Sequence, residues 1–157
     1  MPKYEIVIKK VNPMRVAAVR DVIANYQSVG PLIDELFAEI SKNQIAPAGP
    51  VTTIYYDPEY KEKDVDVEAV VPISNGDEEL SGRVSIKELD GYEEMASLTR
   101  VGPYDDFRPA YQELMDWVQA NGYQMNGPNR EIYLRGPEAN IPPEEYVTEI
   151  QFPVTKA

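Results

Sequence analysis

The sequence has neither cysteine nor histidine among its 157 residues. Without cysteine there is no disulfide, no thiolate nucleophile and no cysteine metal site. Without histidine there is no Ser-His triad, no imidazole general base and no imidazole metal ligand. We therefore expect no metal and no cofactor, and any chemistry must use carboxylates, tyrosines, lysines or backbone amides. No catalytic residue is identifiable from the sequence, so whether the protein is an enzyme stays open.

Long apolar runs are also missing. No stretch approaches the roughly 18 apolar residues of a membrane span, and the start Met1-Pro2-Lys3-Tyr4 has no apolar signal core. These features predict a cytoplasmic protein without a membrane partner. The 27 acidic residues outnumber the 15 basic ones, for a net charge of −12. Such a surface repels nucleic acid phosphates, so we expect no direct nucleic acid binding.

Two similar series of elements follow each other along the chain. Alternating apolar residues predict strands at 3–11, 14–22, 51–56, 65–73, 82–89, 92–101, 129–135 and 145–154. Apolar stripes predict a helix over 31–43 and a second helix that runs from a cap at Asp105 or Asp106 to about residue 121. The acidic segment 74–80 is the natural linker between the two series.

The two series match residue by residue. Tyr26 and Tyr104, like Leu36 and Leu114, are separated by 78 positions. After three extra residues the offset becomes 81, as between Glu68 and Glu149. A constant offset indicates an internal duplication. We predict a single α+β domain over residues 1–157 from two β-β-α-β-β units, 3–75 and 82–154. Each has an antiparallel sheet and one helix, and a pseudo-two-fold axis creates a central ligand groove.

Side-chain alternation then selects candidate binding residues. In 146–154, Ile150 lies on a core-like face and Glu149 on the other, where it is either solvated or the floor of a pocket. We expect Ile132 to pack under the helix and Glu131 to share the second face with Glu149. The same reasoning places Tyr133, Tyr55 and Glu68 on that face. Although strand tyrosines and solvated glutamates are common, their coincidence in both halves favours a site for an amphipathic or cationic ligand.

Several short motifs resemble the GyrI-like small-molecule-binding domain, also called the bacterial transcription-activator effector-binding domain. They are Arg100-Val-Gly-Pro-Tyr104, Tyr111-x-x-Leu114-x-x-Trp117, Asn121-Gly-Tyr123, Gly127-Pro-x-Arg-Glu-Ile-Tyr133, Thr148-Glu149-Ile-x-x-Pro153 and Asp64-Val-Asp-Val-Glu68-x-x-x-Pro72. The resemblance covers essentially the whole chain and implies a duplicated α+β fold with a central pocket. It implies that Glu149 or Glu131 supplies the acid, and that Tyr104, Tyr133 and Tyr55 supply the aromatic rings.

Three functions remain open at this stage. The first is a stand-alone protein that captures amphipathic or cationic drug-like ligands, because relatives grip lipophilic cations with an acid and aromatic rings. The second, which only the family resemblance suggests, is a hydrolase of reactive cyclopropane-type molecules, in which two pocket carboxylates activate water and protonate the leaving group. The third is an interaction protein that resembles a gyrase inhibitor. The protein partner, and any separate DNA-binding protein that it works with, stay unidentified.

Overall fold

The chain divides into two units, each with one helix and one antiparallel sheet. The computed structural model describes residues 4–57, 61–76, 80 and 82–157. We call residues 13–90 the middle unit, and we call residues 91–157 together with the first 12 residues the terminal unit. Each unit is described by itself. Residues 77–79 of the predicted linker lie outside the described residues.

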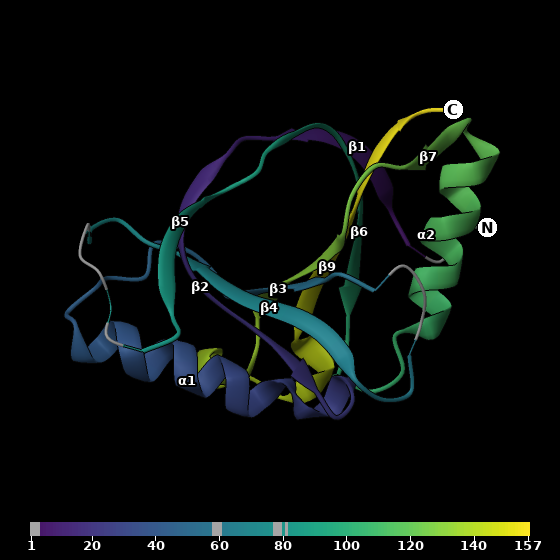
Figure 1. Ribbon diagram of the computed structural model, residues 1–157. Coiled ribbons are helices and arrows are strands. Elements are labelled where there is room, and N and C mark those ends of the chain that lie inside the picture. The colour runs from purple at the N-terminus through teal and green to yellow at the C-terminus, as the bar shows by residue number, and fades with distance from the viewer. Residues whose placement is uncertain (1–3, 58–60, 77–79, 81) are drawn as a thin grey trace. The chain divides into compact units, whose positions relative to one another are not determined.

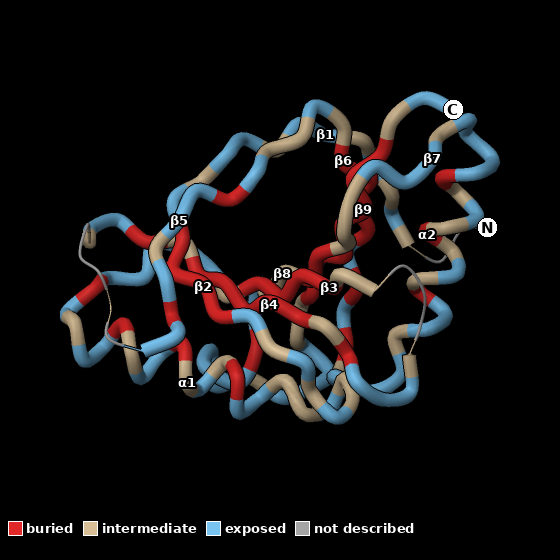
Figure 2. The backbone as a smooth tube through the Cα atoms, in the orientation of Figure 1, coloured by how far each residue is buried: buried red, intermediate tan, exposed pale blue. Residues whose placement is uncertain are grey.

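The middle unit contains one sheet and a helix along one of its faces (Figure 1). Its strands lie in the order β3-β4-β2-β5, and neighbouring strands are antiparallel. The bounds are β2 (Met14–Ile23), α1 (Val29–Lys42), β3 (Thr52–Tyr55), β4 (Val65–Pro72) and β5 (Ser85–Leu89), with a 3-10 turn at Tyr26–Ser28. Figure 2 shows β4 as buried along nearly its whole length.

The terminal unit repeats this arrangement with one addition. Its strands lie in the order β1-β6-β9-β8, all antiparallel, and the short strand β7 pairs with the end of β9. The bounds are β1 (Ile6–Val11), β6 (Tyr92–Val101), α2 (Arg108–Ala120), β7 (Tyr123–Met125), β8 (Asn129–Arg135) and β9 (Val147–Lys156). Two 3-10 turns, Pro137–Ala139 and Pro143–Glu145, connect β8 to β9. The sequence pattern missed β7.

The first strand of each predicted half lies in the unit formed mainly by the other half. β1 pairs with β6, where Ile6 faces Leu98, and β5 pairs with β2, where Lys87 faces Val16. Two-residue hairpins need positive φ, which proline cannot adopt, and the connection from β1 to β2 contains Pro13. The connection from β5 to β6 has no positive φ either. Neither strand therefore turns back on its successor.

Each helix buries one apolar stripe on its own sheet. In α1 the stripe is Leu32, Leu36 and Ile40, spaced four residues apart so that all three lie on one side of the helix. In α2 the corresponding residues are Ala110, Leu114 and Val118. Both predicted helices and the α+β class are confirmed, whereas the duplication and the pseudo-two-fold axis stay predictions. Within the described residues, neither helix is long and apolar enough to cross a membrane.

The stripe of α1 gives a direct test of this packing. Leu36 is fully buried, whereas the neighbouring Phe37 is 36% exposed. We expect Leu36→Ala to lower the free energy of unfolding by about 2–5 kcal/mol, because it leaves a cavity in the core. Phe37→Ala, although it removes more atoms, should cost much less. Urea unfolding of both variants measures the difference, and equal losses would contradict the orientation of α1.

Candidate functional site

Glu131 lies on the face of the terminal sheet that α2 covers. In β8 it stands opposite Ile150 of β9, which belongs to the core under α2. Ile132 stands opposite Glu149 on the other face. The prediction that Ile132 packs under the helix was therefore wrong, and so was the prediction that Glu131 and Glu149 share a face. Arg130 and Glu131 are both buried, so burial does not reveal the alternation of β8.

Two tyrosines hold the carboxylate of Glu131. The hydroxyl of Tyr111, on α2, donates a hydrogen bond to Oε2 of Glu131, and the hydroxyl of Tyr133 donates one to Oε1 at 2.8 Å. The side-chain amide of Asn129 donates in turn to the Tyr111 hydroxyl at 3.0 Å. One phenol per oxygen fixes the orientation of the carboxylate, and the amide fixes one of the phenols.

Among the described residues, no Lys or Arg forms an ion pair with Glu131. The residue is 8% exposed. Desolvation raises the pKa of Glu131, and the hydrogen bonds from Tyr111 and Tyr133 and the more distant charge of Arg100 only partly offset this rise. The neutral acid is therefore favoured here more than in water.

A group of three tyrosine rings begins at Tyr133, whose hydroxyl contacts this carboxylate. The Tyr104 ring meets the Tyr133 ring edge to face at 5.6 Å and lies 4.9 Å from the Tyr146 ring. Tyr104 is 45% exposed, so this group of rings reaches the protein surface. Desolvation, together with the charge of Glu138 and the neighbouring Tyr146, raises the pKa of Tyr104 to about 12. These neutral rings offer π-faces to a flat or cationic molecule.

Glu149 lies on the opposite face of the same sheet and is already neutralised. Lys9 of β1 is 2.5 Å from it, while Ser97 donates at 2.6 Å and Gln151 at 2.8 Å. Desolvation alone would raise the pKa of Glu149, but these three partners together lower it. At 7% exposure the residue is not solvated. Glu149 is therefore buried, as expected for the floor of a pocket, but its carboxylate is already paired with Lys9.

Tyr55 belongs to the core of the middle unit. It stands opposite Val67, is 7% exposed and packs against α1. Its ring meets Tyr26 edge to face at 5.4 Å, and Thr53 donates to its hydroxyl at 3.2 Å. The predicted shared face of Tyr55 and Glu68 was also wrong, because Ile54 stands opposite Glu68.

Glu68 repeats the environment of Glu149. Lys87 of β5 lies 2.6 Å from its carboxylate, and the Tyr56 hydroxyl donates to it at 2.5 Å. Of the five candidate residues, the structure thus brings Tyr104, Glu131 and Tyr133 together and leaves out Glu149 and Tyr55.

Three members of the site were missed from the sequence. The alternation of 146–154 puts Tyr146 on the same core-like face as Ile150, and the apolar stripe of the second helix includes Tyr111, but a tyrosine on an apolar face still carries a polar hydroxyl. No pattern in the sequence marks Asn129. A usable signal was present: Tyr111 lies on the apolar stripe of α2, facing the strand that contains Glu131.

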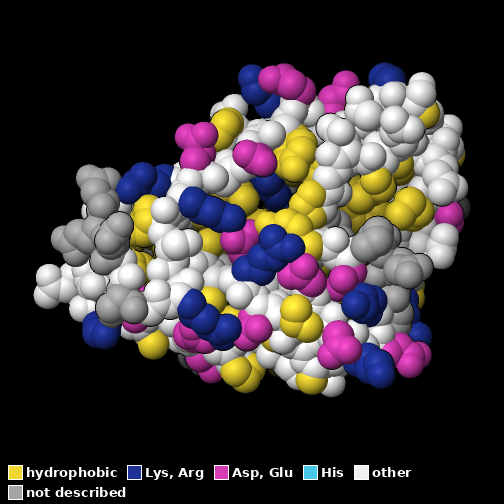
Figure 3. Space-filling model, in the orientation of Figure 1, with side chains coloured by type: hydrophobic (Ala, Val, Ile, Leu, Met, Phe, Trp, Pro, Cys, Tyr) yellow, Lys and Arg dark blue, Asp and Glu magenta, His cyan; other side chains and the backbone are white. Residues whose placement is uncertain are grey.

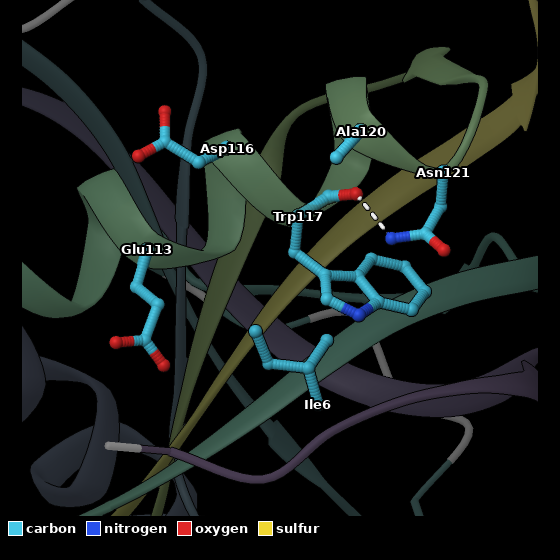
Figure 4. A pocket seen from close by; sticks show the side chains of 6 residues that line it. All are labelled: Ile6, Glu113, Asp116, Trp117, Ala120 and Asn121. Atoms are coloured by element: carbon cyan, nitrogen blue, oxygen red, sulfur yellow. Dashed lines mark hydrogen bonds between the residues drawn. The ribbon is translucent and has the colours of Figure 1, made fainter. Parts of the chain in front are cut away.

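A depression on the terminal unit lies elsewhere, along α2 and β1. It has a volume of about 280 Å³ and is lined by Ile6, Glu113, Asp116, Trp117, Ala120 and Asn121 (Figure 4). The Trp117 ring is half-buried and stacks on the Tyr123 ring, with 6.2 Å between the ring centroids. None of the five candidate residues lines this depression.

The two glutamates of the terminal unit should respond oppositely to pH. A raised folded pKa, as at Glu131, gives stability that is present below the ordinary value of 4.5 and is lost as pH rises. A lowered folded pKa, as at Glu149, gives stability that is present above 4.5 and is lost as pH falls. Relative to Glu131→Gln, the wild type should therefore be more stable at about pH 4 than at about pH 7. Relative to Glu149→Gln, the order should reverse. Urea unfolding at both pH values measures this, and differences of the same sign would refute it.

Comparisons with known proteins agree with this architecture. The model of the GyrI-like small-molecule-binding domain matches residues 4–155. A crystal structure of the EcmrR C-terminal domain is 30% identical, with a TM-score of 0.92, and the match covers 99% of this chain and all of that domain. In a cryo-EM structure of an EcmrR–DNA complex, identity is 31% and the TM-score is 0.89, over 98% of this chain and 58% of the EcmrR chain. A comparison with curated proteins gives no match.

More distant structures share the fold alone. A hydrolase encoded by lin2189 from Listeria innocua is 16% identical with a TM-score of 0.67, over 98% of this chain and 93% of that one. SAV2435 bound to tetraphenylphosphonium is 12% identical with a TM-score of 0.59, over 96% and 94% of the two chains. Because the family model covers nearly the whole sequence, this chain belongs to the GyrI-like small-molecule-binding domain family.

Proposed function

We propose that the terminal unit binds an amphipathic cation between the tyrosine rings and Glu131. The observation that carries this proposal is a buried carboxyl group with a raised pKa and no ion pair within the described part of the chain. A buried charge is unfavourable unless it is paired. A cationic ligand supplies the missing charge, and the rings of Tyr104, Tyr133 and Tyr146 supply apolar contact.

The two other buried glutamates differ from Glu131 in this respect. Glu149 and Glu68 each have a lysine within 2.6 Å, so a ligand cation there would have to displace an existing partner. A cation bound at Glu131 instead favours its ionised form and so lowers its raised pKa. For the ligand to reach Glu131, the Tyr104 side chain must also move, because its partly exposed ring packs against the Tyr133 ring.

Tetraphenylphosphonium, the ligand named for SAV2435, is a suitable probe because it is aromatic and permanently charged. We expect Glu131→Gln to weaken its binding roughly 10- to 100-fold, as for the loss of one charge-assisted contact. The matched change Glu149→Gln should alter affinity by less than about twofold, because Lys9 already pairs with that carboxylate. Isothermal titration calorimetry measures both. Loss of affinity in Glu149→Gln with no change in Glu131→Gln would overturn the assignment.

Hydrolysis is a second candidate, supported by the same raised pKa. A carboxyl with a raised pKa, held by two phenols, is better suited to act as a general acid than an ordinary carboxylate. In a strained electrophilic ring, water would add to one carbon while Glu131 protonates the carbon released by ring opening. The proton of the added water then returns to the Glu131 carboxylate. Since Glu149 lies on the other face of the sheet, the predicted pair of carboxylates does not act together.

Product analysis tests this second candidate. We expect the wild type to convert a strained cyclopropane-bearing electrophile to its hydrated ring-opened product. Glu131→Gln should lower the rate roughly 100-fold or more, because general acid catalysis contributes about 10²–10⁴-fold. Intact substrate after prolonged incubation with the wild type would exclude hydrolysis and leave the binding proposal in place.

The third alternative, an interaction protein that resembles a gyrase inhibitor, stays a prediction. Acidic and basic side chains lie among one another on the side of the molecule shown in Figure 3. Mimicry of DNA calls for a continuous acidic surface, so this side offers it no support.

A further inference from the structure

Thr148 carries a buried hydroxyl without a hydrogen-bond partner. The residue lies in β9, opposite Tyr133 of β8 and Arg100 of β6, and therefore on the same sheet face as Glu131. It is 1% exposed, and its Oγ1 has no hydrogen-bond partner among the described residues. A buried hydroxyl in this state lowers stability, so such groups are rare and require an explanation.

The neighbours of Thr148 direct their polar groups elsewhere. Arg100 donates from one nitrogen to the carbonyl oxygen of Pro103 at 2.6 Å and from the other to Asp105, with its guanidinium over the Phe107 ring. The hydroxyl of Tyr133 donates to Glu131. Thr148 is thus the direct neighbour of Tyr133 in the candidate site, and the groups on either side leave the hydrogen-bonding capacity of its Oγ1 unused.

The middle unit has an apolar residue at the same register position. There Tyr55 stands opposite Val67, as Tyr133 stands opposite Thr148 in the terminal unit. Val67 is fully buried, which shows that valine fills this position without loss of packing. The place corresponding to Glu131 is held by Thr53 in that unit, where it bonds to Tyr55. The uncompensated acid and the unpartnered hydroxyl therefore occur together in one unit and are both missing from the other.

We propose that Thr148 determines which cations the Glu131 site prefers, by accepting a hydrogen bond from an N–H group of the ligand. This inference rests on the proposed binding function. Thr148 and Glu131 are diagonal neighbours on adjacent strands, with Cα atoms about 7–8 Å apart, so one ammonium group can reach both side chains. A protonated amine carries the required N–H, whereas a quaternary ammonium or phosphonium does not. The site thus selects amphipathic protonated amines.

Two matched probes test this selection: pyrenylbutyl-dimethylamine, which is protonated at neutral pH, and pyrenylbutyl-trimethylammonium. We expect Thr148→Val to weaken binding of the protonated amine about 5- to 10-fold, as for the loss of one hydrogen bond, and to leave the quaternary probe within about twofold. Thr148→Ser should keep the wild-type ratio. Thr99→Val, an exposed position in β6 on the other sheet face, is the control and should change neither affinity.

Thermal unfolding of the unliganded protein gives a second readout. Thr148→Val removes an unsatisfied polar group without changing volume, so it should raise Tm by about 2–4 °C. A lower Tm would show that the hydroxyl is already satisfied in the folded protein and would overturn the inference.

The two proposals fail in different ways. Should Glu131→Gln weaken both probes while Thr148→Val affects them equally, the binding site stands and the selection by Thr148 is wrong. Should neither probe respond to Glu131→Gln, the proposed site itself is wrong and the role of Thr148 falls with it. Selective loss of the protonated amine in Thr148→Val, with rescue in Thr148→Ser, supports both.

Discussion

The free energy of placing carboxylates inside a sheet governs the chemistry of this protein. Glu68, Glu131 and Glu149 are 4%, 8% and 7% exposed. Two of them receive a lysine from a strand two positions away in the sheet, Lys87 for Glu68 and Lys9 for Glu149. Among the described residues, the carboxylate of Glu131 has only the neutral hydroxyls of Tyr111 and Tyr133 as partners. Because an unpaired buried charge is costly, Glu131 is the acid at which we propose that a ligand cation binds.

Much of the fold could be predicted from periodicity. The spacing of Leu32, Leu36 and Ile40 located α1, and alternation located every long strand. The strand β7 escaped because three residues, Tyr123 to Met125, show no period. The pairing of β1 with β6, and of β5 with β2, was not predictable either. Strand pairing depends on contacts between residues far apart in the sequence, and the apolar pattern of a strand is the same whichever neighbour it pairs with.

The candidate site was only partly predictable, and the reason lies in the strand register. Tyr104, Tyr133 and Glu131 come together as expected, whereas Glu149 and Tyr55 do not. In β8 the buried residues are the charged Arg130 and Glu131, and in β3 all four residues are buried, so neither polarity nor burial reveals which side α2 or α1 covers. Choosing the wrong side is equivalent to a shift of one residue. The prediction therefore placed Ile132 on the helix face and Glu131 on the other face, the reverse of the observed pairing. Only the pairing with β9 fixes the faces.

The strands of the terminal sheet come from distant parts of the chain, so they are synthesised, and can pair, at different times. Ile6 of β1 pairs with Leu98 of β6, about 90 residues further along the chain. At a translation rate of about 5–20 residues per second, β1 waits roughly 5–20 s for its neighbour to leave the ribosome. The middle unit, a continuous segment, is complete before then. Although β1 is made before the other strands of its sheet, it thus stays unpaired until β6 is made, and Lys9 reaches Glu149 only after β9 has been made.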